Sequence, residues 1–267
     1  NCRESSSTSI LETRLIYMSN QEKFVGFVTV RTSSTRLPKK CLLPFGESTV
    51  LNHIIRRAIS YDIEPIVCTS TSKEDNIIEE IANKEGVKIY RGSLHNKLQR
   101  WLDCAMHFNI NAFHTIDADD PFFDGNEMIS SMKMLQKKGF DMVSPTESSS
   151  AGGASVGYSL TTDIVKRACK GLDKDTDTEM MWHYMEKIQN LKVKILPEIR
   201  KNISKMRLTL DYEEDYWMLE SVRKMLGNLT SRDKVDQLFS SNPDLYKINW
   251  FRNEEWKVGQ LSKKINN

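Results

Sequence analysis

The chain of 267 residues is long enough to bury most of the surface that it exposes when unfolded, as one large or two modest domains. Hydrophobic and charged fractions of 39% and 28% are ordinary for a globular protein, and a net charge of +2 gives no general reason to expect nucleic acid. No apolar run approaches the length that spans a membrane.

The cysteines and the first residues of the chain restrict the class of protein further. The five cysteines are scattered without a Cys-x-x-Cys pair, which predicts reduced thiols in a cytoplasmic enzyme and argues against a disulfide framework or a zinc site. The first residues are rich in serine and lack the long apolar core of a signal peptide. We expect residues 1–20 to be a poorly ordered extension or linker and residues 21–267 to form a single domain.

From residue 24 to residue 144, apolar runs typical of buried strands alternate with segments of helical spacing. Strands are expected at 24–30, 65–69, 87–90, 112–116 and 141–144. Helices are expected from Val50, from Ser72, and around 98–105 and 128–135. This alternation predicts a mainly parallel sheet with helices on both faces, whose ligand lies beyond the carboxyl ends of the strands.

The second half is less regular. Residues 147–155 have the composition of a mobile loop. Further strands are expected at 157–160, 192–196 and 207–211, and helices at 162–170, 177–189 and 213–227. The tail after Ser231 is expected to be helical and to cover the sheet.

The loop after the first strand carries the strongest functional signal. It holds the cations Arg31, Arg36 and Lys40 together with the hydroxyl groups of Ser33 and Ser34. Guanidinium, ammonium and hydroxyl donors in one loop suit a polyphosphate, which needs both charge neutralisation and hydrogen bonds.

Carboxylates follow two of the expected strands. Asp117, Asp119 and Asp120 come after the strand at 112–116, and Asp211 ends the strand at 207–211. Mg²⁺ prefers such oxygen ligands and usually takes one or two protein carboxylates plus substrate phosphates. Asp117 and Asp120 can instead start a turn before Pro121. Because a polyphosphate loop lies on the same chain, we expect Asp119 and Asp211 to bind Mg²⁺.

The loop sequence Arg31-x-Ser33-Ser34-x-Arg36-Leu37-Pro38-x-Lys40 resembles the nucleotide loop of cytidylyltransferases that make CMP-activated acidic sugars. This family includes the CMP-3-deoxy-manno-octulosonate synthetases and, nearby, the spore-coat polysaccharide biosynthesis protein F family. Further matches follow in the family's order: Thr69-Ser70 with Asp75, Arg91-Gly92-Ser93 with Leu98 and Arg100, Asp119-x-Pro121 with Asp124, and Leu208-Thr209-x-Asp211 with Glu214-Asp215. The resemblance spans roughly residues 24–220 and implies an α/β, Rossmann-like nucleotidyltransferase fold of the glycosyltransferase-A type, with a mainly parallel mixed sheet.

The resemblance also implies a function. It implies a CTP- and Mg²⁺-dependent cytidylyltransferase that joins CMP to a small acidic acceptor, either a sugar acid or a phosphonate or phosphate compound, and releases pyrophosphate. Arg36 and Lys40 are then the expected catalytic cations, with Asp119 and Asp211 as the catalytic, metal-binding carboxylates. The other expected nucleotide-binding residues are Arg31, Ser33, Ser34, Thr69, Ser70, Arg91, Ser93 and Arg100.

Two departures from the family concern the loop and the acceptor. Lys39 stands where the family usually has glycine. The stretch 152–158 is small and neutral where the spore-coat branch commonly has acidic residues, so we expect a remodelled acceptor-binding part around 145–200. Tyr158, Glu179 and His183 are the candidates for contacts with the acceptor.

Two other functions stay open at this point. The first is a glycosyltransferase that uses a nucleotide-activated sugar on the same fold, and the second is a nucleotide-binding module without catalysis. Arg36 and Lys40 argue against the first, because a nucleoside diphosphate sugar has no γ-phosphate to bind. The carboxylates of Asp119 and Asp211 argue against the second. A homodimer is left open, and His53, His107 and His114 are expected to be packing or surface residues.

Overall fold

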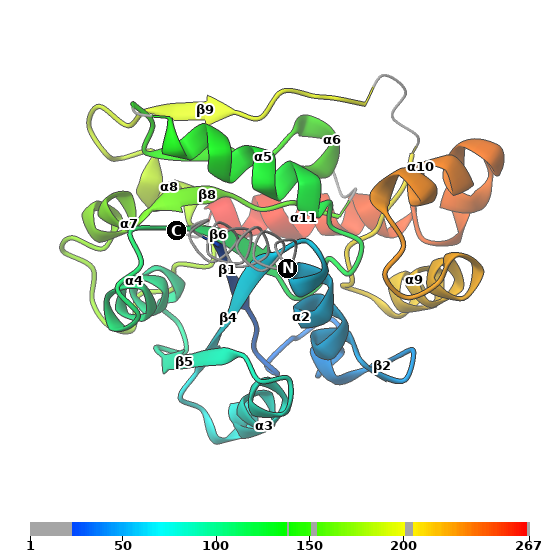
Figure 1. Ribbon diagram of the computed structural model, residues 1–267, viewed down its shortest axis with the longest axis horizontal. Helices are drawn as coiled ribbons and strands as arrows, with labels where there is room; N and C mark the ends of the chain where they lie inside the picture. Colours follow the sequence, from blue (N-terminus) through cyan, green and yellow to red (C-terminus); the bar gives the residue numbers. More distant parts are fainter. Residues whose placement is uncertain (1–22, 138, 151–153, 201–204, 266–267) are drawn as a thin grey trace, which may run out of the picture.

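The computed structural model describes residues 23–137, 139–150, 154–200 and 205–265, so the expected extension at 1–20 lies outside the described residues. A seven-stranded sheet in the order β5-β4-β1-β6-β8-β7-β9 forms its centre (Figure 1). The strands are β1 Phe24–Thr29, β4 Ile63–Ser70, β5 Lys88–Gly92, β6 Ala112–Asp117, β7 Met142–Ser144, β8 Ser159–Thr161 and β9 Val193–Ile195. A small hairpin joins β2 Pro44–Phe45 to β3 Ser48–Thr49.

The sheet is mixed, as expected. β5, β4, β1 and β6 are parallel to one another, whereas β8 runs antiparallel to both β6 and β7, and β9 runs parallel to β7. The chain leaves β1 towards β4 on one side, while β6 pairs with the other side of β1. This reversal leaves a crevice at the carboxyl ends of β1 and β6, where Thr29 and Asp117 are neighbours in register.

Helices cover both faces of the sheet (Figure 1). The longer ones are α2 Val50–Ser60, α3 Asn76–Lys84, α4 Lys97–His107, α5 Gly125–Gln136, α7 Thr162–Ala168, α9 Glu213–Leu226, α10 Arg232–Ser241 and α11 Arg252–Ile265. Short turns form α6 Glu147–Ser150, α8 Trp182–Met185, η1 Lys40–Leu42, η2 Lys73–Asp75 and η3 Leu245–Ile248.

The core has one layer on each face of the sheet because side chains alternate along a buried strand. On β1, Phe27 joins the layer under α4 and α7, and its ring stacks on Phe113 with centroids 4.0 Å apart. The next residue, Val28, joins the layer under α2, α3, α9 and α10. Both faces of the strand are therefore buried, which explains its continuous apolar sequence.

Three expected elements are wrong or incomplete. The segment 207–211 is not a strand: it is tied to the loop after β6 by one backbone bond, from Leu210 N to Asp119 O at 2.7 Å. The helix expected at 177–189 is reduced to α8, and Thr178, near its expected start, instead bonds α4 through its hydroxyl, which accepts from Leu98 N at 3.0 Å. The loop expected at 147–155 begins with the single turn of α6, and residues 151–153 lie outside the described residues. Among the described residues, no helix is both long and apolar enough to cross a membrane.

Candidate active site

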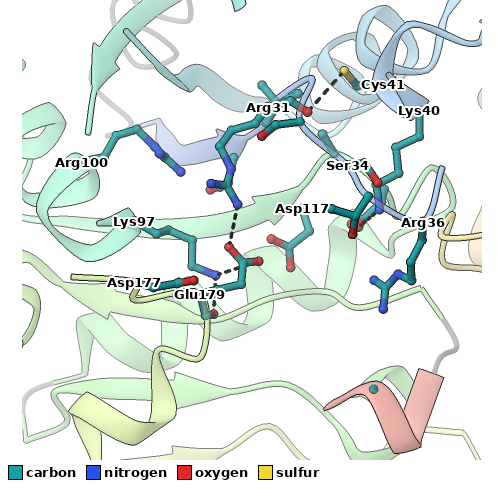
Figure 2. A pocket seen from close by; sticks show the side chains of 17 residues that line it. Arg31, Ser34, Arg36, Lys40, Cys41, Lys97, Arg100, Asp117, Asp177 and Glu179 are labelled. Carbon is teal, nitrogen blue, oxygen red and sulfur yellow. Dashed lines mark hydrogen bonds and ion pairs between the residues drawn. The ribbon is translucent and has the colours of Figure 1, made fainter. Parts of the chain in front are cut away.

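A cavity of about 540 Å³ opens where β1 and β6 end (Figure 2). One part of its lining is the loop after β1, with Arg31, Ser33, Ser34, Thr35, Arg36, Lys40 and Cys41. The rest comes from distant segments: Thr29, Val30, Lys97, Arg100, Asp117, Ala118, Asp119, Asp177, Glu179 and Gly259. Cationic and acidic side chains thus face the same space.

The loop after β1 is held at its first turn by a buried carboxylate. Asp75 accepts hydrogen bonds from the backbone N of Thr32 at 2.8 Å and from its hydroxyl at 2.7 Å. The carbonyl of Thr32 in turn accepts from the backbone N of Ser34 at 2.9 Å and of Lys39 at 3.2 Å. Lys39 closes the turn in the left-handed conformation, with φ of 53°, which explains why glycine is suited to this position.

Four residues expected to act together meet at one end of the cavity: Arg36, Lys40 and Asp119 line it, whereas Asp211 lies buried behind Arg36 and Lys40 and does not. The ammonium of Lys40 donates to Asp119 Oδ2 at 2.6 Å, to Leu210 O at 2.7 Å and to Asp211 Oδ1 at 2.9 Å. Arg36 Nη2 donates to the same oxygen of Asp211 at 2.6 Å. Burial alone would lower the pKa of Lys40, but the charges of Asp119 and Asp211 outweigh it and raise the pKa above its ordinary value.

Buried groups hold the carboxylate of Asp211 in place. Its side chain is only 3% exposed and accepts from Arg207 Nη2 at 3.3 Å. Arg207, fully buried, also donates to Asp215 at 2.9 Å, and Asp215 accepts from the backbone N of Asp211 at 3.0 Å. Burial opposes the charge of Asp211, but Lys40 and Arg36 keep the pKa of its carboxyl below its ordinary value. Asp211 is therefore ionised and held in one orientation.

The neighbouring aspartates differ from Asp119 in their surroundings. Burial, with the charge of Asp119, raises the pKa of Asp117 to about 6. Asp120 is buried and its Oδ1 has no hydrogen-bond partner among the described residues; burial and Asp119 raise its pKa well above the usual range. Asp117 faces the cavity and Asp120 does not line it.

At the other end of the cavity a second group of charges gathers (Figure 2). Arg31 donates to Glu179 Oε2 at 3.0 Å and to Leu94 O at 2.7 Å, and Lys97 donates to Glu179 O at 3.0 Å. Arg100 is 1% exposed, and its Nε has no hydrogen-bond partner in the part of the chain that the structure describes. Burial and the nearby Arg31 lower the pKa of Arg100 to about 10.

Several residues expected at the nucleotide lie outside this cavity. Thr69 is buried, and Ser70 Oγ donates to Asp75 Oδ2 at 2.5 Å. The guanidinium of Arg91 points to Ser70 O, Ser72 O and Glu79, at 3.0, 2.7 and 2.7 Å. Ser93 donates to Lys174 O at 3.1 Å. Ser70, Arg91 and Ser93 therefore have structural partners in the fold, whereas the buried hydroxyl of Thr69 has no hydrogen-bond partner among the described residues. Ser70 acts on the loop only through Asp75.

The three candidates for contacts with the acceptor also divide into residues that line the cavity and residues that do not. Glu179 lines the cavity. Tyr158 Oη accepts from Trp182 Nε1 at 2.7 Å and does not line it. His183 lies on α8 with its Nε2 2.8 Å from the ammonium of Lys187, again outside the lining.

Sequence reasoning missed Lys97, Asp177 and Gly259, which line the cavity, and Asp75 as the anchor of the loop. Asp75 was part of the family's motif, which was a usable signal. Lys97 lies near Arg100 on α4. The motif therefore indicated the helix that carries Lys97, but not the direction of the Lys97 side chain.

A metal would have two carboxylates available here. The described residues contain no group of three or more His, Cys, Asp or Glu that could hold a metal ion. Asp119 and Asp211 nevertheless converge on one positive group, the ammonium of Lys40, within 2.9 Å. Two carboxylates that share a cation fit the demand of Mg²⁺, whose remaining ligands are water and substrate phosphates.

Comparisons with known proteins agree with this architecture. Residues 25–252 match the cytidylyltransferase family. The uncharacterised protein MJ1063 of Methanocaldococcus jannaschii is 31% identical over 234 residues, covering 85% of this chain and 94% of that protein. The spore coat polysaccharide biosynthesis protein SpsF of Bacillus subtilis is 25% identical over 228 residues, covering 81% of this chain and 94% of its own length.

Solved structures show the same fold. A cytidylyltransferase from Leptospira borgpetersenii superposes with a TM-score of 0.73 at 25% identity, over 85% of this chain and 97% of that one. A CMP:2-keto-3-deoxy-manno-octonic acid synthetase complexed with CTP gives a TM-score of 0.58 at 12% identity, over 76% and 99% of the two chains. The expected Rossmann-like nucleotidyltransferase fold is therefore confirmed. Since the family match runs through most of the chain, the protein belongs to the cytidylyltransferase family of nucleotidyltransferases.

Proposed function

We propose that the protein transfers CMP from CTP to a small acidic, sugar-like acceptor and releases pyrophosphate. The observation that carries the proposal is the meeting of Lys40 and Arg36 with Asp119 and Asp211 at one end of the cavity that the loop lines. The relative SpsF is named for polysaccharide biosynthesis, which favours a sugar-like acceptor over a phosphonate.

In the proposed reaction an acceptor oxygen attacks the α-phosphorus of CTP, and the bond to the bridging oxygen of pyrophosphate breaks. Negative charge then grows on the leaving pyrophosphate. Lys40 and Arg36, already fixed by their carboxylate partners, stabilise this charge more in the transition state than in the ground state. Lys40 is protonated throughout because its pKa is raised, so it acts as a hydrogen-bond donor and not as a base.

The other residues of the loop bind and orient the nucleotide. Arg31, at the end of the cavity away from Lys40 and Arg36, and Ser33 and Ser34, on the same loop, line the cavity and supply donors to the triphosphate. Arg100, with its unpartnered Nε, is suited to an acceptor atom of the base or the ribose. In this proposal Thr69, Ser70, Arg91 and Ser93 support the site without touching the nucleotide.

Asp119 and Asp211 would hold Mg²⁺ together with phosphate oxygens. When bound there, the metal would neutralise phosphate charge and lower the pKa of an acceptor hydroxyl. The protein's own part is to keep the carboxylate of Asp211 ionised, through Lys40 and Arg36, and to hold it in place, through Arg36 and Arg207.

Pyrophosphate release tests the proposal. The protein is incubated with each of the four nucleoside triphosphates, Mg²⁺ and a panel of sugar acids, neutral sugars and phosphonates. We expect release with CTP and a sugar acid. If CTP gives no release with any acceptor while a CMP- or UDP-sugar is consumed, the glycosyltransferase alternative is correct instead. If neither reaction occurs but CTP binds, the chain is a nucleotide-binding module.

A further inference from the structure

Helix α11 takes part in the site although all of it except its first residue, Arg252, lies beyond the family match, which ends at residue 252. Arg252 donates to both oxygens of Glu214, at 3.0 and 2.9 Å. The guanidinium of Arg207, which holds Asp211, lies 5.9 Å from the ring centre of Trp256. One face of α11 thus packs against Arg207, which holds Asp211, and against Glu214 at the start of α9.

The same helix reaches the cavity one turn further on, where Gly259 forms part of the lining. Positions 252, 256 and 259 follow the helical repeat and so lie on one side of α11. In Figure 2 the red ribbon of α11 lies below Arg36, across the cavity from the loop that bears Arg31 and Lys40, while Asp177 and Glu179 lie below Arg31. The wall opposite the nucleotide loop is therefore built by the second half of the chain.

A glycine inside a helix needs a reason, because it is less favourable there than alanine. Gly259 does not have a positive φ, and a Cβ built on it would meet no heavy atom of the described residues within 4 Å. Gly125, by contrast, has no room for a Cβ because the ring of Tyr61 occupies the space. Neither backbone conformation nor packing among the described residues demands glycine at 259, and its effect is to leave space at the cavity.

We propose that α11 is the acceptor-side wall of the site and that Gly259 sets the size of acceptor that it admits. This inference rests on the proposed function. CTP phosphates bound by Arg36 and Lys40 lie along the loop, and the acceptor reaches the α-phosphorus from the remaining side, bounded by Glu179 and α11. A side chain at 259 projects into that side, so it excludes large acceptors and leaves CTP in place.

The test compares Gly259→Ala and Gly259→Leu with Val258→Leu, a matched control on an exposed position of the same helix. Pyrophosphate release is measured with Mg·CTP and three 3-deoxy-2-keto sugar acids of six, eight and nine carbons. We expect Gly259→Leu to raise the KM of the largest acid that is used by about tenfold or more, and that of smaller acids less. The KM of CTP stays as in the wild type.

Two further measurements keep the outcome clear. Gly259→Ala should raise the melting temperature, because alanine is the better helix former, so a loss of acceptor affinity in that variant cannot come from misfolding; for Gly259→Leu, a melting temperature no lower than that of the wild type gives the same assurance. Calorimetry should give the same Kd for Mg·CTP in Gly259→Leu, Val258→Leu and the wild type. Equal losses with acids of every size, or weaker binding of Mg·CTP, would overturn the proposal.

A failure of the proposed function would give a different result from a failure of the proposal for Gly259. If the wild type releases pyrophosphate with none of the acids, the acceptor class is refuted. Calorimetry then still tests where residue 259 lies relative to bound CTP. An unchanged Kd for Mg·CTP in Gly259→Leu supports a position outside the nucleotide site, and a several-fold weaker Kd contradicts it.

Discussion

Replacing Lys40 by methionine tests the catalytic proposal most directly. Methionine keeps the length and the apolar stem of lysine but removes the ammonium that joins Asp119, Leu210 O and Asp211. Removing one donor to the charge of a transition state typically lowers kcat by about 10²–10³, or about 3–4 kcal/mol. We expect a loss of this size in pyrophosphate release.

The effect on stability should be smaller. In Lys40→Met, Asp211 keeps Arg36 at 2.6 Å and Arg207 at 3.3 Å, and Asp119 is 28% exposed and can be hydrated. No buried carboxylate is left without a counter-charge, so the cost lies below the 3–5 kcal/mol of a fully broken buried pair. We expect about 1–3 kcal/mol, which lowers the melting temperature by several degrees and leaves the protein folded at assay temperature.

The matched control is Lys39→Met, because Lys39 is adjacent, exposed and outside the cavity lining. Steady-state pyrophosphate release at saturating CTP and acceptor gives kcat, and thermal unfolding followed by circular dichroism gives stability. A kcat for Lys40→Met within about threefold of Lys39→Met would refute the reasoning and remove Lys40 from the mechanism.

Three other changes have definite expected outcomes. Asp211→Asn keeps the shape of the side chain but not its charge, so activity or its Mg²⁺ requirement should disappear; a normal Mg²⁺ titration would make Asp211 structural. Lys39→Gly removes the strain of φ 53° and should raise the free energy of unfolding in urea by up to about 1 kcal/mol with unchanged turnover; a less stable variant contradicts this. Burial lowers the pKa of His114 to about 4 from its ordinary 6.5, so the unfolded chain binds the proton first as pH falls, and stability is lost from about pH 6.5 towards 4. Between pH 7 and 5 this loss should be about 2 kcal/mol, and urea titrations of His114→Gln should show a pH profile flatter by that amount.

The first half of the fold could be predicted closely from sequence. The expected strand at 112–116 and helix at 98–105 correspond to β6 and α4, because strongly periodic apolar segments fix both the element and its buried face. The second half of the fold was harder to predict. Residues 207–211 had the apolar composition of a strand, but no strand lies beside them in the described structure, and they are held by the ion pairs of Arg207 and Asp211 and by one backbone bond.

Motif matching located segments of the site better than individual side chains. Arg36 and Lys40 were expected at the site and line the cavity, whereas Arg91 and Ser93, also in a matched segment, have partners elsewhere. A motif predicts in which segment, at the end of which strand, a residue lies. It does not give the direction of the side chain, which depends on the charges and carbonyl groups that the fold brings near.

The sequence by itself determined the cationic loop, the parallel strands around it and the family, because these depend on residues close together in the chain. Only the tertiary structure decided that Lys40 meets Asp211, 171 residues away, and that Gly259 faces the same cavity. Such contacts arise when separate helices and strands bury their apolar faces on one sheet, and local sequence spacing carries no information about that distance.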